Sequence, residues 1–224
     1  MYKKAKMNSF TEENYLKAIY KLSLNGVQGV STNAIADKLA TKPSSVTDMI
    51  KKLADKKLVS YQKYQGVNLT KKGSDVAVSI IRNHRLWEVF LVEKLNFKWD
   101  EVHDLAEELE HINTHKLTER LDEFLGFPKF DPHGDPIPDK DGNIIQHKDV
   151  TLSDLIRGEK AVVVGVKEHS KSYLNYLEQL QLVLGAEVEV KDIVEFDATM
   201  QILVNNKQVI ISNQASKNLI VKKI

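Results

Sequence analysis

The segment HRLWEVFLVEKLNFKWDEVHDLAEELEH (84–111) determines how the rest of the chain is interpreted. His84 and Glu88 are four residues apart, so on a helix they lie one turn apart on the same face. From residue 102 to 112, the polar residues fall within about 100° of one helix face, and the apolar residues mark the opposite face. The polar set is His103, Glu107, Glu110 and His111; the apolar set is Val102, Leu105, Leu109 and Ile112.

Imidazole nitrogen and carboxylate oxygen together suit a divalent ion such as Mn(II), Fe(II), Zn(II), Co(II) or Ni(II). The alternative is a solvated helix face on which His and Glu side chains four residues apart form hydrogen bonds. One such pair favours the solvated face, whereas six of these residues on two neighbouring helices favour a metal site. The segment therefore predicts a divalent-metal site.

Composition excludes several classes of site and protein. The chain has 224 residues, 42% of them hydrophobic, which is enough for one to three domains with apolar cores. It has no cysteine, which excludes disulfides, thiolate metal sites and cysteine nucleophiles. It has no run of about 18 apolar residues, and its first ten residues lack an apolar signal segment. We therefore expect a cytoplasmic protein without a membrane span.

The net charge of +1 conceals an uneven distribution along the chain. Residues 1–75 contain 14 Lys and 6 acidic residues, a balance of +8. Residues 76–140 carry −6 and residues 141–224 carry −1. A basic first third followed by an acidic middle predicts a polyanion-binding module joined to a cation-binding one.

The basic first third has the pattern of a winged helix-turn-helix. Two short helices are joined by a tight turn, and a hairpin with Gln65–Gly66 at its turn follows them. Pro43 begins the second of these helices, at a position where proline is favoured. The predicted elements are a helix at 11–24 with Thr11 as N-cap and Asn14 three residues later, helices at 31–40 and 43–56, and strands at 58–64 and 67–70.

The helix at 43–56 is the predicted recognition helix. A helix-turn-helix presents the N-terminal residues of this helix to base edges, while nearby lysines contact phosphates. The residues expected at base edges are Lys42, Ser44, Ser45, Thr47 and Asp48. Those expected at phosphates are Lys51, Lys52, Lys56, Lys57 and Lys63 in the wing.

The remainder of the chain predicts a helical domain, a linker and a small β domain. Short β-branched segments in the last third indicate a small SH3-like β-barrel. The predicted fold is therefore mainly α with this small β domain. Its expected domains are 1–73 (winged helix-turn-helix), 74–140 (helical, metal-binding and dimerising), 141–150 (linker) and 151–224 (SH3-like). The expected elements beyond residue 70 are helices at 71–95, 102–112, 114–125 and 172–184, a loop at 126–142, and strands at 161–166, 187–194, 200–204, 208–211 and 218–221.

Other histidines and aromatic residues carry weaker signals. His115 is expected to be solvated, and His133 and His147 to be incidental to function. His169, beside Glu168 at the start of the β domain, is a less favoured candidate for approaching a metal on the other domain. Large apolar residues of the middle region are expected to form core or a dimer surface; they are Trp87, Phe90, Leu91, Leu95, Phe97 and Trp99.

The chain resembles the diphtheria toxin repressor family of metal-dependent transcriptional regulators, including its manganese sensors. The resemblance is specific over residues 11–140 and weaker beyond, where TLSDLIRGEKAVVVGV (151–166) resembles the family's SH3-like, FeoA-like domain. The segments that carry it are ENYLKAIYKL (13–22), KPSSVTDMIKKL (42–53), LVSYQKYQGVNLTKKG (58–73), RNHRLWEVFL (82–91), WDEVHDLAEELEH (99–111) and HGDPIP (133–138).

The resemblance implies two metal ions per subunit, Mn(II) or Fe(II), in a homodimer that binds double-stranded operator DNA. It implies an ancillary site of His84, Glu88 and His103, with Glu168 as the candidate ligand from the third domain. It implies a primary site of Glu107, Glu110 and His111, completed by Asn14 from the first helix.

This sequence departs from the family at the primary site. Glu107 stands where iron sensors have cysteine, which favours a harder ion such as Mn(II). Asn14 stands where relatives have Met or Asp, and an amide oxygen is the weaker donor. Lys17 stands where some manganese sensors have glutamate, so their binuclear arrangement is not expected here.

The expected function is that of a metal-dependent repressor controlling metal-ion homeostasis, in which the ion locks the dimer in its operator-binding geometry. One alternative is a metal-independent winged-helix regulator whose C-terminal domain binds a protein partner. Another is a carboxylate-bridged metalloenzyme, suggested by the Glu108-x-x-His111 spacing. The second copy that such an enzyme needs is missing, as are nucleotide-binding and hydrolase motifs, so we predict that the protein is not an enzyme.

Overall fold

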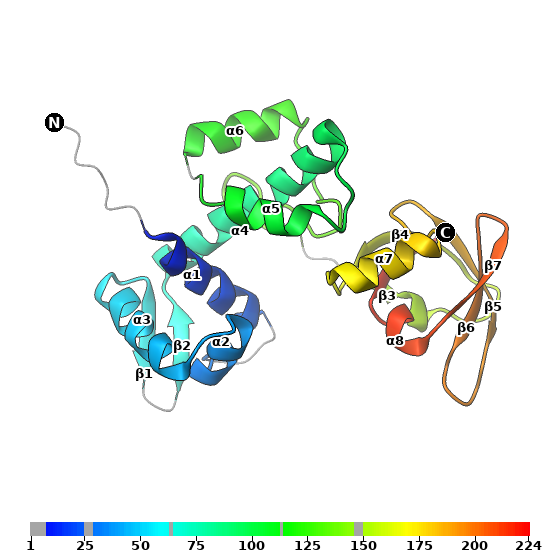
Figure 1. Ribbon diagram of the computed structural model, residues 1–224, viewed down its shortest axis with the longest axis horizontal. Helices are drawn as coiled ribbons and strands as arrows, with labels where there is room; N and C mark the ends of the chain where they lie inside the picture. The colour runs from blue at the N-terminus through cyan, green and yellow to red at the C-terminus, as the bar shows by residue number, and fades with distance from the viewer. Residues whose placement is uncertain (1–7, 25–28, 63–64, 113, 146–149) are drawn as a thin grey trace. The chain divides into compact units, whose positions relative to one another are not determined.

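The computed structural model describes residues 8–24, 29–62, 65–112, 114–145 and 150–224 (Figure 1). The predicted Lys63 and His147 lie outside these residues. The chain divides into two compact units whose segments alternate along the sequence. The first unit comprises residues up to His84, Leu109–Leu117 and Pro138–Asn143; the second comprises Arg85–Glu108, Thr118–Ile137 and Ile144–Ile224.

The first unit contains the winged helix-turn-helix, coloured blue to cyan in Figure 1. The strands of its hairpin pair antiparallel, and Val30 bridges to Val67 with backbone hydrogen bonds of 2.9 Å in both directions. Three apolar residues at helical spacing on the recognition helix are buried: Val46, Ile50 and Leu53 are at most 1% exposed, while Met49 is partly buried. The elements are α1 (Phe10–Ser23), α2 (Thr32–Lys38), α3 (Pro43–Asp55), β1 (Val59–Gln62) and β2 (Gly66–Leu69).

The first helix begins earlier than the sequence pattern predicted. Ser9, not Thr11, is its N-cap: the Ser9 hydroxyl accepts from the backbone N–H of Glu12, and the Glu12 carboxylate accepts from the backbone N–H of Ser9 at 2.8 Å. This is a capping box, in which two otherwise unpaired backbone donors are satisfied. Thr11 is not the cap, because Ser9 has the glutamate of a capping box three residues later, whereas Thr11 has Asn14 at that position.

A long helix, α4 (Lys71–Leu95), runs from the first unit into the second. It is followed by α5 (Val102–Leu109) and α6 (His115–Phe124). Leu86, Val89, Leu121 and Ile137 form a small apolar cluster in the second unit. The helix predicted to run to Ile112 ends at Leu109, and Ile112 is 49% exposed, so Glu110 and His111 lie in a turn beyond the helix end.

The last third of the chain is a six-stranded antiparallel sheet in the strand order β3-β8-β4-β5-β6-β7. Leu174 and Leu177 of α7 pack into its apolar core, which confirms a small SH3-like β domain. The predicted helix at 172–184 is shorter, because Gln181 adopts a positive φ of 60° that a helix does not tolerate. The elements are β3 (Val150–Thr151), η1 (Leu152–Asp154), β4 (Lys160–Val166), α7 (Lys171–Gln179), β5 (Glu187–Ile193), β6 (Met200–Val204), β7 (Lys207–Ile211), α8 (Asn213–Ser216) and β8 (Leu219–Lys223).

None of the helices in the described part of the chain combines the length and the apolarity that a membrane span requires.

Candidate metal centres and DNA-binding face

In the first unit, one side of α1 carries two buried charged residues, Glu13 and Lys17, and the partly buried Asn14. Glu13 and Lys17 are one helical turn apart, and Asn14 follows Glu13 directly. Glu13 is 7% exposed and Lys17 is 6% exposed. The turn after α5 brings Glu110 and His111 to this face. We refer to Glu13, Asn14, Lys17, His84, Glu110 and His111 as the first cluster.

Glu110 lies at the centre of the first cluster and is completely buried. Its Oε2 atom lies 2.6 Å from the Lys17 Nζ atom and 2.8 Å from the His84 Nδ1 atom. Its backbone carbonyl accepts a hydrogen bond of 3.2 Å from the Asn83 side chain. Helix α4 and helix α1 therefore both hold this carboxylate in place.

Two buried oxygen atoms of the first cluster have no hydrogen-bond partner among the described residues: Asn14 Oδ1 and Glu110 Oε1. Leaving a buried acceptor unsatisfied costs about 1–3 kcal/mol, so such atoms are rare and call for an explanation. Both are oxygen donors of the kind that Mn(II) prefers. These residues therefore fit a divalent cation.

His111 faces the same cluster from the turn after α5. Its Nδ1 atom lies 2.7 Å from the Glu13 Oε2 atom, and its ring stacks on Phe10 with the centroids 4.6 Å apart. Burial raises the pKa of Glu13, and the hydrogen bond with His111 offsets this only in part. Glu13 was not among the residues predicted from the sequence, although it precedes Asn14 directly on the helix face that carries the predicted ligand.

A second group of potential ligands lies in the second unit. Ligand atoms of Glu88, Asp131 and His133 lie within 4.8 Å of one another, and all three residues are buried. Glu88 Oε1 is 3.6 Å from His133 Nδ1 and 3.3 Å from His103 Nδ1. We refer to Glu88, His103, Asp131 and His133 as the second cluster.

Burial and neighbouring charges shift the pKa values of two members of the second cluster, His133 and Asp131. Burial alone would lower the pKa of His133, but the hydrogen bond and the charge of Glu88 raise this pKa to about 9. Burial and the charges of Glu88 and Asp135 raise the pKa of Asp131 to about 7, against the opposing charge of Arg85. The His133 Nε2 atom lies 2.7 Å from the Trp99 carbonyl oxygen, so it donates a hydrogen bond there and directs Nδ1 at Glu88. Metal-ligating histidines are commonly oriented by such a bond.

His133 was expected to be incidental to function, but its buried position in the second cluster makes it a candidate ligand. The backbone of its loop pairs with β4: Val166 N–H donates to the His133 carbonyl at 2.9 Å. Gly134 (φ +87°) packs so closely here that a Cβ would lie 2.1 Å from the Val164 carbonyl oxygen. This long-range contact, which local sequence does not reveal, places His133.

Glu168, the ligand expected from the β domain, lies outside the second cluster as the structure groups it. The Glu168 carboxylate is exposed and accepts a hydrogen bond of 2.8 Å from the backbone N–H of Ser170. His169, named beside it, lies against His133 with ring centroids 5.1 Å apart. Its buried Nε2 atom has no hydrogen-bond partner among the described residues, and burial lowers its pKa to about 4.

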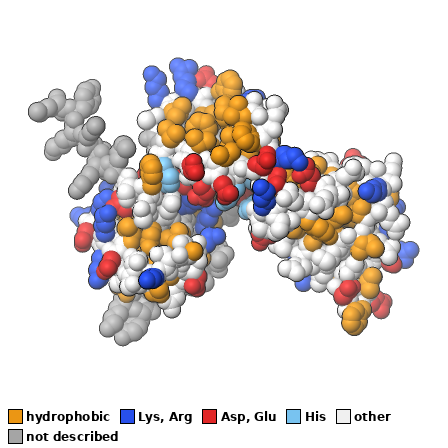
Figure 2. Space-filling view, in the orientation of Figure 1, with side chains coloured by type: hydrophobic (Ala, Val, Ile, Leu, Met, Phe, Trp, Pro, Cys, Tyr) orange, Lys and Arg blue, Asp and Glu red, His pale blue; other side chains and the backbone are white. Residues whose placement is uncertain are grey.

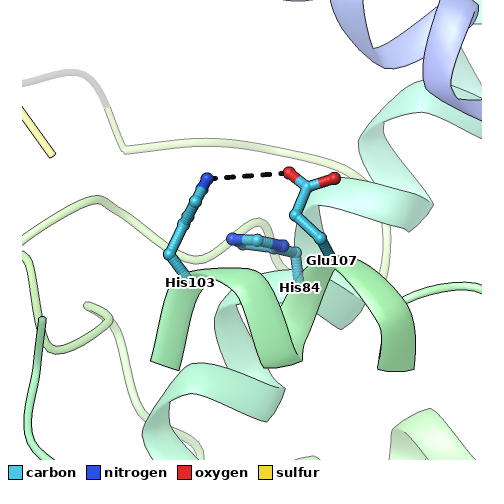
Figure 3. A group of neighbouring side chains, drawn as sticks. All are labelled: His84, His103 and Glu107. Carbon is cyan, nitrogen blue, oxygen red and sulfur yellow. Dashed lines mark ion pairs between the residues drawn. The ribbon is translucent and has the colours of Figure 1, made fainter. Parts of the chain in front are cut away.

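Glu107, expected with Glu110 and His111, pairs instead with His103. The His103 Nε2 atom lies 3.8 Å from the Glu107 Oε1 atom, and Figure 3 draws this pair with the neighbouring His84. His84 is one turn before Glu88 on α4, a helix that continues without a break into the second unit. Glu107 thus lies within reach of His103, one of the residues expected for the ancillary site.

The predicted DNA-binding residues form one solvated face at the start of α3. Lys42, Ser44, Ser45 and Asp48 are exposed, and the Thr47 hydroxyl donates to the Pro43 carbonyl at 3.1 Å. Three of the predicted phosphate-binding lysines have partners within the protein. Lys51 lies 3.5 Å from a carboxylate oxygen of Asp48. Lys52 and Lys56 lie 3.2 Å and 2.7 Å from the carboxylate oxygens of Glu12.

Large apolar side chains are exposed in the helical region. Figure 2 shows apolar side chains gathered over α6. At the end of α6 and just after it, Phe124 and Phe127 are 63% and 57% exposed. Trp87 and Phe90, expected in a core or a dimer surface, are partly buried against the small apolar cluster of Leu86 and Val89.

Three family descriptions match successive parts of the chain. Residues 7–67 match the N-terminal DNA-binding domain of iron-dependent repressors, and residues 70–139 match their metal-binding and dimerisation domain. Residues 150–223 match the FeoA domain. The chain therefore belongs to the diphtheria toxin repressor family, a family of metal-dependent transcriptional repressors.

Individual relatives agree with this assignment. The iron-dependent repressor IdeR of Mycobacterium leprae is 29% identical over 180 residues, which cover 76% of this chain and 78% of that protein. A solved manganese-dependent transcriptional repressor in complex with manganese is 32% identical, with a TM-score of 0.82, over 95% of this chain and all of the other. The manganese regulator SloR is 34% identical, with a TM-score of 0.72, over 95% and 98% of the two chains.

Proposed function

We propose that this protein represses genes of metal-ion homeostasis when Mn(II) or Fe(II) occupies its first cluster. The observation that carries the proposal is the pair of buried, unsatisfied oxygens, Asn14 Oδ1 and Glu110 Oε1, beside the His111 imidazole. The donor set contains oxygen and nitrogen without sulfur, which favours Mn(II). Glu107, which precedes Glu110 and His111 in sequence, remains a proposed ligand of this first ion.

We propose a second ion in each subunit, held by the second cluster. Glu88, Asp131 and His133 offer two carboxylates and one imidazole within 4.8 Å of one another, and His103 offers a second imidazole. His84, expected in this site from the family resemblance, is hydrogen-bonded to Glu110. His169 takes the place proposed for Glu168.

The proposed partners are double-stranded operator DNA and a second copy of the chain. The exposed residues at the start of α3 are placed to meet base edges, as in other helix-turn-helix proteins. The exposed apolar face over α6 supports self-association. A transcriptional repressor of this kind acts in the cytoplasm.

The mechanism that we propose depends on how α1 is held. Asn14 and Glu13 lie on a helix of the DNA-binding domain, whereas Glu110 and His111 lie in the turn after α5. A bound cation supplies a positive charge that ligands from both segments share. Glu110 and His111 then restrain α1, and with it the orientation of α3. In a dimer this fixes the separation of two recognition helices, which must match half-sites about 34 Å apart.

Thermodynamic linkage relates the affinity for the ion to the affinity for operator DNA. If the ion tightens operator binding by some factor, operator DNA must tighten ion binding by the same factor. Fluorescence anisotropy of a labelled operator duplex, selected by repeated enrichment on the protein, tests this with chelated protein and with added Mn(II) or Fe(II). We expect tighter binding with metal. Equal affinity in both conditions would favour the metal-independent regulator.

A further inference from the structure

Lys17 is a cation inside the first cluster. Its Nζ atom lies 2.6 Å from Glu110 Oε2, and its side chain is only 8% exposed. Lysine is almost never buried to this extent unless it is paired. The pair is positioned by α1, which projects Lys17 from the same face as Glu13 and Asn14.

The two oxygens of Glu110 have different surroundings. Oε2 contacts both Lys17 and His84, whereas Oε1 has no hydrogen-bond partner among the described residues. A divalent ion can therefore approach Oε1 while the ammonium stays on Oε2. The Lys17 ammonium and an ion bound at Oε1 would then interact strongly, because charges that are close together in a buried site are weakly screened.

We propose that Lys17 is the internal counter-charge of the regulatory metal site and sets its affinity. Without metal, the ammonium stabilises the buried Glu110 carboxylate. With metal, the same ammonium repels the incoming cation, so the site responds only at a higher metal concentration than its ligands alone would allow. This inference rests on the proposed function, since it assumes that the first cluster takes a divalent ion.

Removing the charge of Lys17 should change two properties in opposite directions. In Lys17→Met, the buried Glu110 carboxylate of the metal-free protein keeps His84 but loses the ammonium, so the melting temperature should fall. The metal then neutralises this carboxylate without repulsion from an ammonium, so the dissociation constant for Mn(II) should fall about tenfold or more. A residue that only positions Glu110 would have the opposite effect on affinity.

The experiment is a calorimetric Mn(II) titration of chelated full-length protein, with thermal unfolding measured with and without Mn(II). Lys17→Gln is the second neutral variant if Lys17→Met does not fold, and Lys17→Arg keeps the charge and should keep the wild-type affinity. Lys71→Gln is the matched control, because it removes a lysine from the exposed Lys71–Asp75 pair. It should leave Mn(II) affinity unchanged.

A double-mutant cycle identifies the partner of Lys17. In a Glu110→Gln background, Lys17→Met should no longer lower the melting temperature of the metal-free protein, because the buried carboxylate that the lysine balances is gone. Unchanged or weaker Mn(II) binding by both neutral variants, with binding by the wild type intact, would overturn the counter-charge and leave the repressor proposal standing. If the wild-type protein binds no Mn(II), both proposals fail.

Discussion

The Glu12 carboxylate lies 2.7 Å from the Lys56 ammonium and so joins the first turn of α1 to the end of the recognition helix. The same carboxylate contacts Lys52 and closes the capping box with Ser9. Glu12 is 1% exposed, so these partners replace the water that it loses on folding. One side chain therefore links the start of the helix that carries the candidate ligands to the DNA-binding helix.

Replacing Glu12 with Gln should destabilise the protein in a pH-dependent way. Burial alone would raise the pKa of Glu12, but the hydrogen bonds and charges of Lys56, Ser9 and Lys52 lower it from 4.5 to about 2. The carboxylate therefore adds stability that is complete above about pH 4.5 and is lost as the pH falls toward 2. With about 1.4 kcal/mol per pKa unit, Glu12→Gln should cost roughly 1–3 kcal/mol at pH 7.

Urea unfolding of Glu12→Gln and wild type at a series of pH values checks this prediction. The difference between the two proteins should shrink between pH 4.5 and pH 2. Lys71→Gln, which breaks an exposed pair, should cost less than about 0.5 kcal/mol at any of these values. A constant difference across the series would show that Glu12 acts through packing and not through its charge.

Removing the His111 imidazole should abolish the metal response without unfolding the protein. His111→Ala deletes one candidate ligand and the stacking on Phe10, which together should lower the unfolding free energy by about 1 kcal/mol. Operator affinity with Mn(II) should then equal the affinity without it. His115→Ala, at the exposed start of α6, is the control and should keep the response. A metal response that survives in His111→Ala would remove this residue from the regulatory site.

The second cluster predicts a change in stoichiometry. His133→Ala should reduce the bound Mn(II) from two ions per subunit to one, as counted by elemental analysis after dialysis. His133→Gln is the companion variant, since it keeps a hydrogen-bonding group at this buried position. Glu168→Gln should still bind two ions, because that carboxylate is exposed and bonded to Ser170. Loss of an ion in Glu168→Gln would support the ligand set inferred from the sequence instead.

Sequence patterns predicted the parts of the fold that depend on local periodicity. Val46, Ile50 and Leu53 repeat at helical spacing, and the helix that contains them buries all three. The same kind of pattern misplaced the end of α5, because Ile112 continues the apolar stripe although the backbone leaves the helix at Leu109. Periodicity records which residues suit a helix and does not record where a tertiary contact ends it.

The residues of the candidate sites also differ in how far local sequence predicts them. His84, Glu88 and His103 were predictable because they lie on helix faces with regular spacing. His133 was not, because its burial depends on a loop whose backbone bonds to β4, far along the chain. The contact behind the role proposed for Lys17 was equally hidden: the sequence indicated a departure from related sensors, but the 2.6 Å contact with Glu110 is visible only in the structure.

The exposed apolar face over α6 predicts a dimer that one substitution can break. Phe124 is 63% exposed, and its ring has Phe90 and Lys94 as neighbours, so it stands at the edge of the helical apolar cluster. Phe124→Asp places a charge on this face, and burying that charge at an interface would cost more than the association provides. We expect analytical ultracentrifugation to show a monomer, and circular dichroism to show that this monomer is still folded.

Phe196→Asp, in the β5–β6 turn and 96% exposed, is the matched control and should remain a dimer. Dissociation of the Phe196 variant with retention of the Phe124 dimer would place the interface on the β domain.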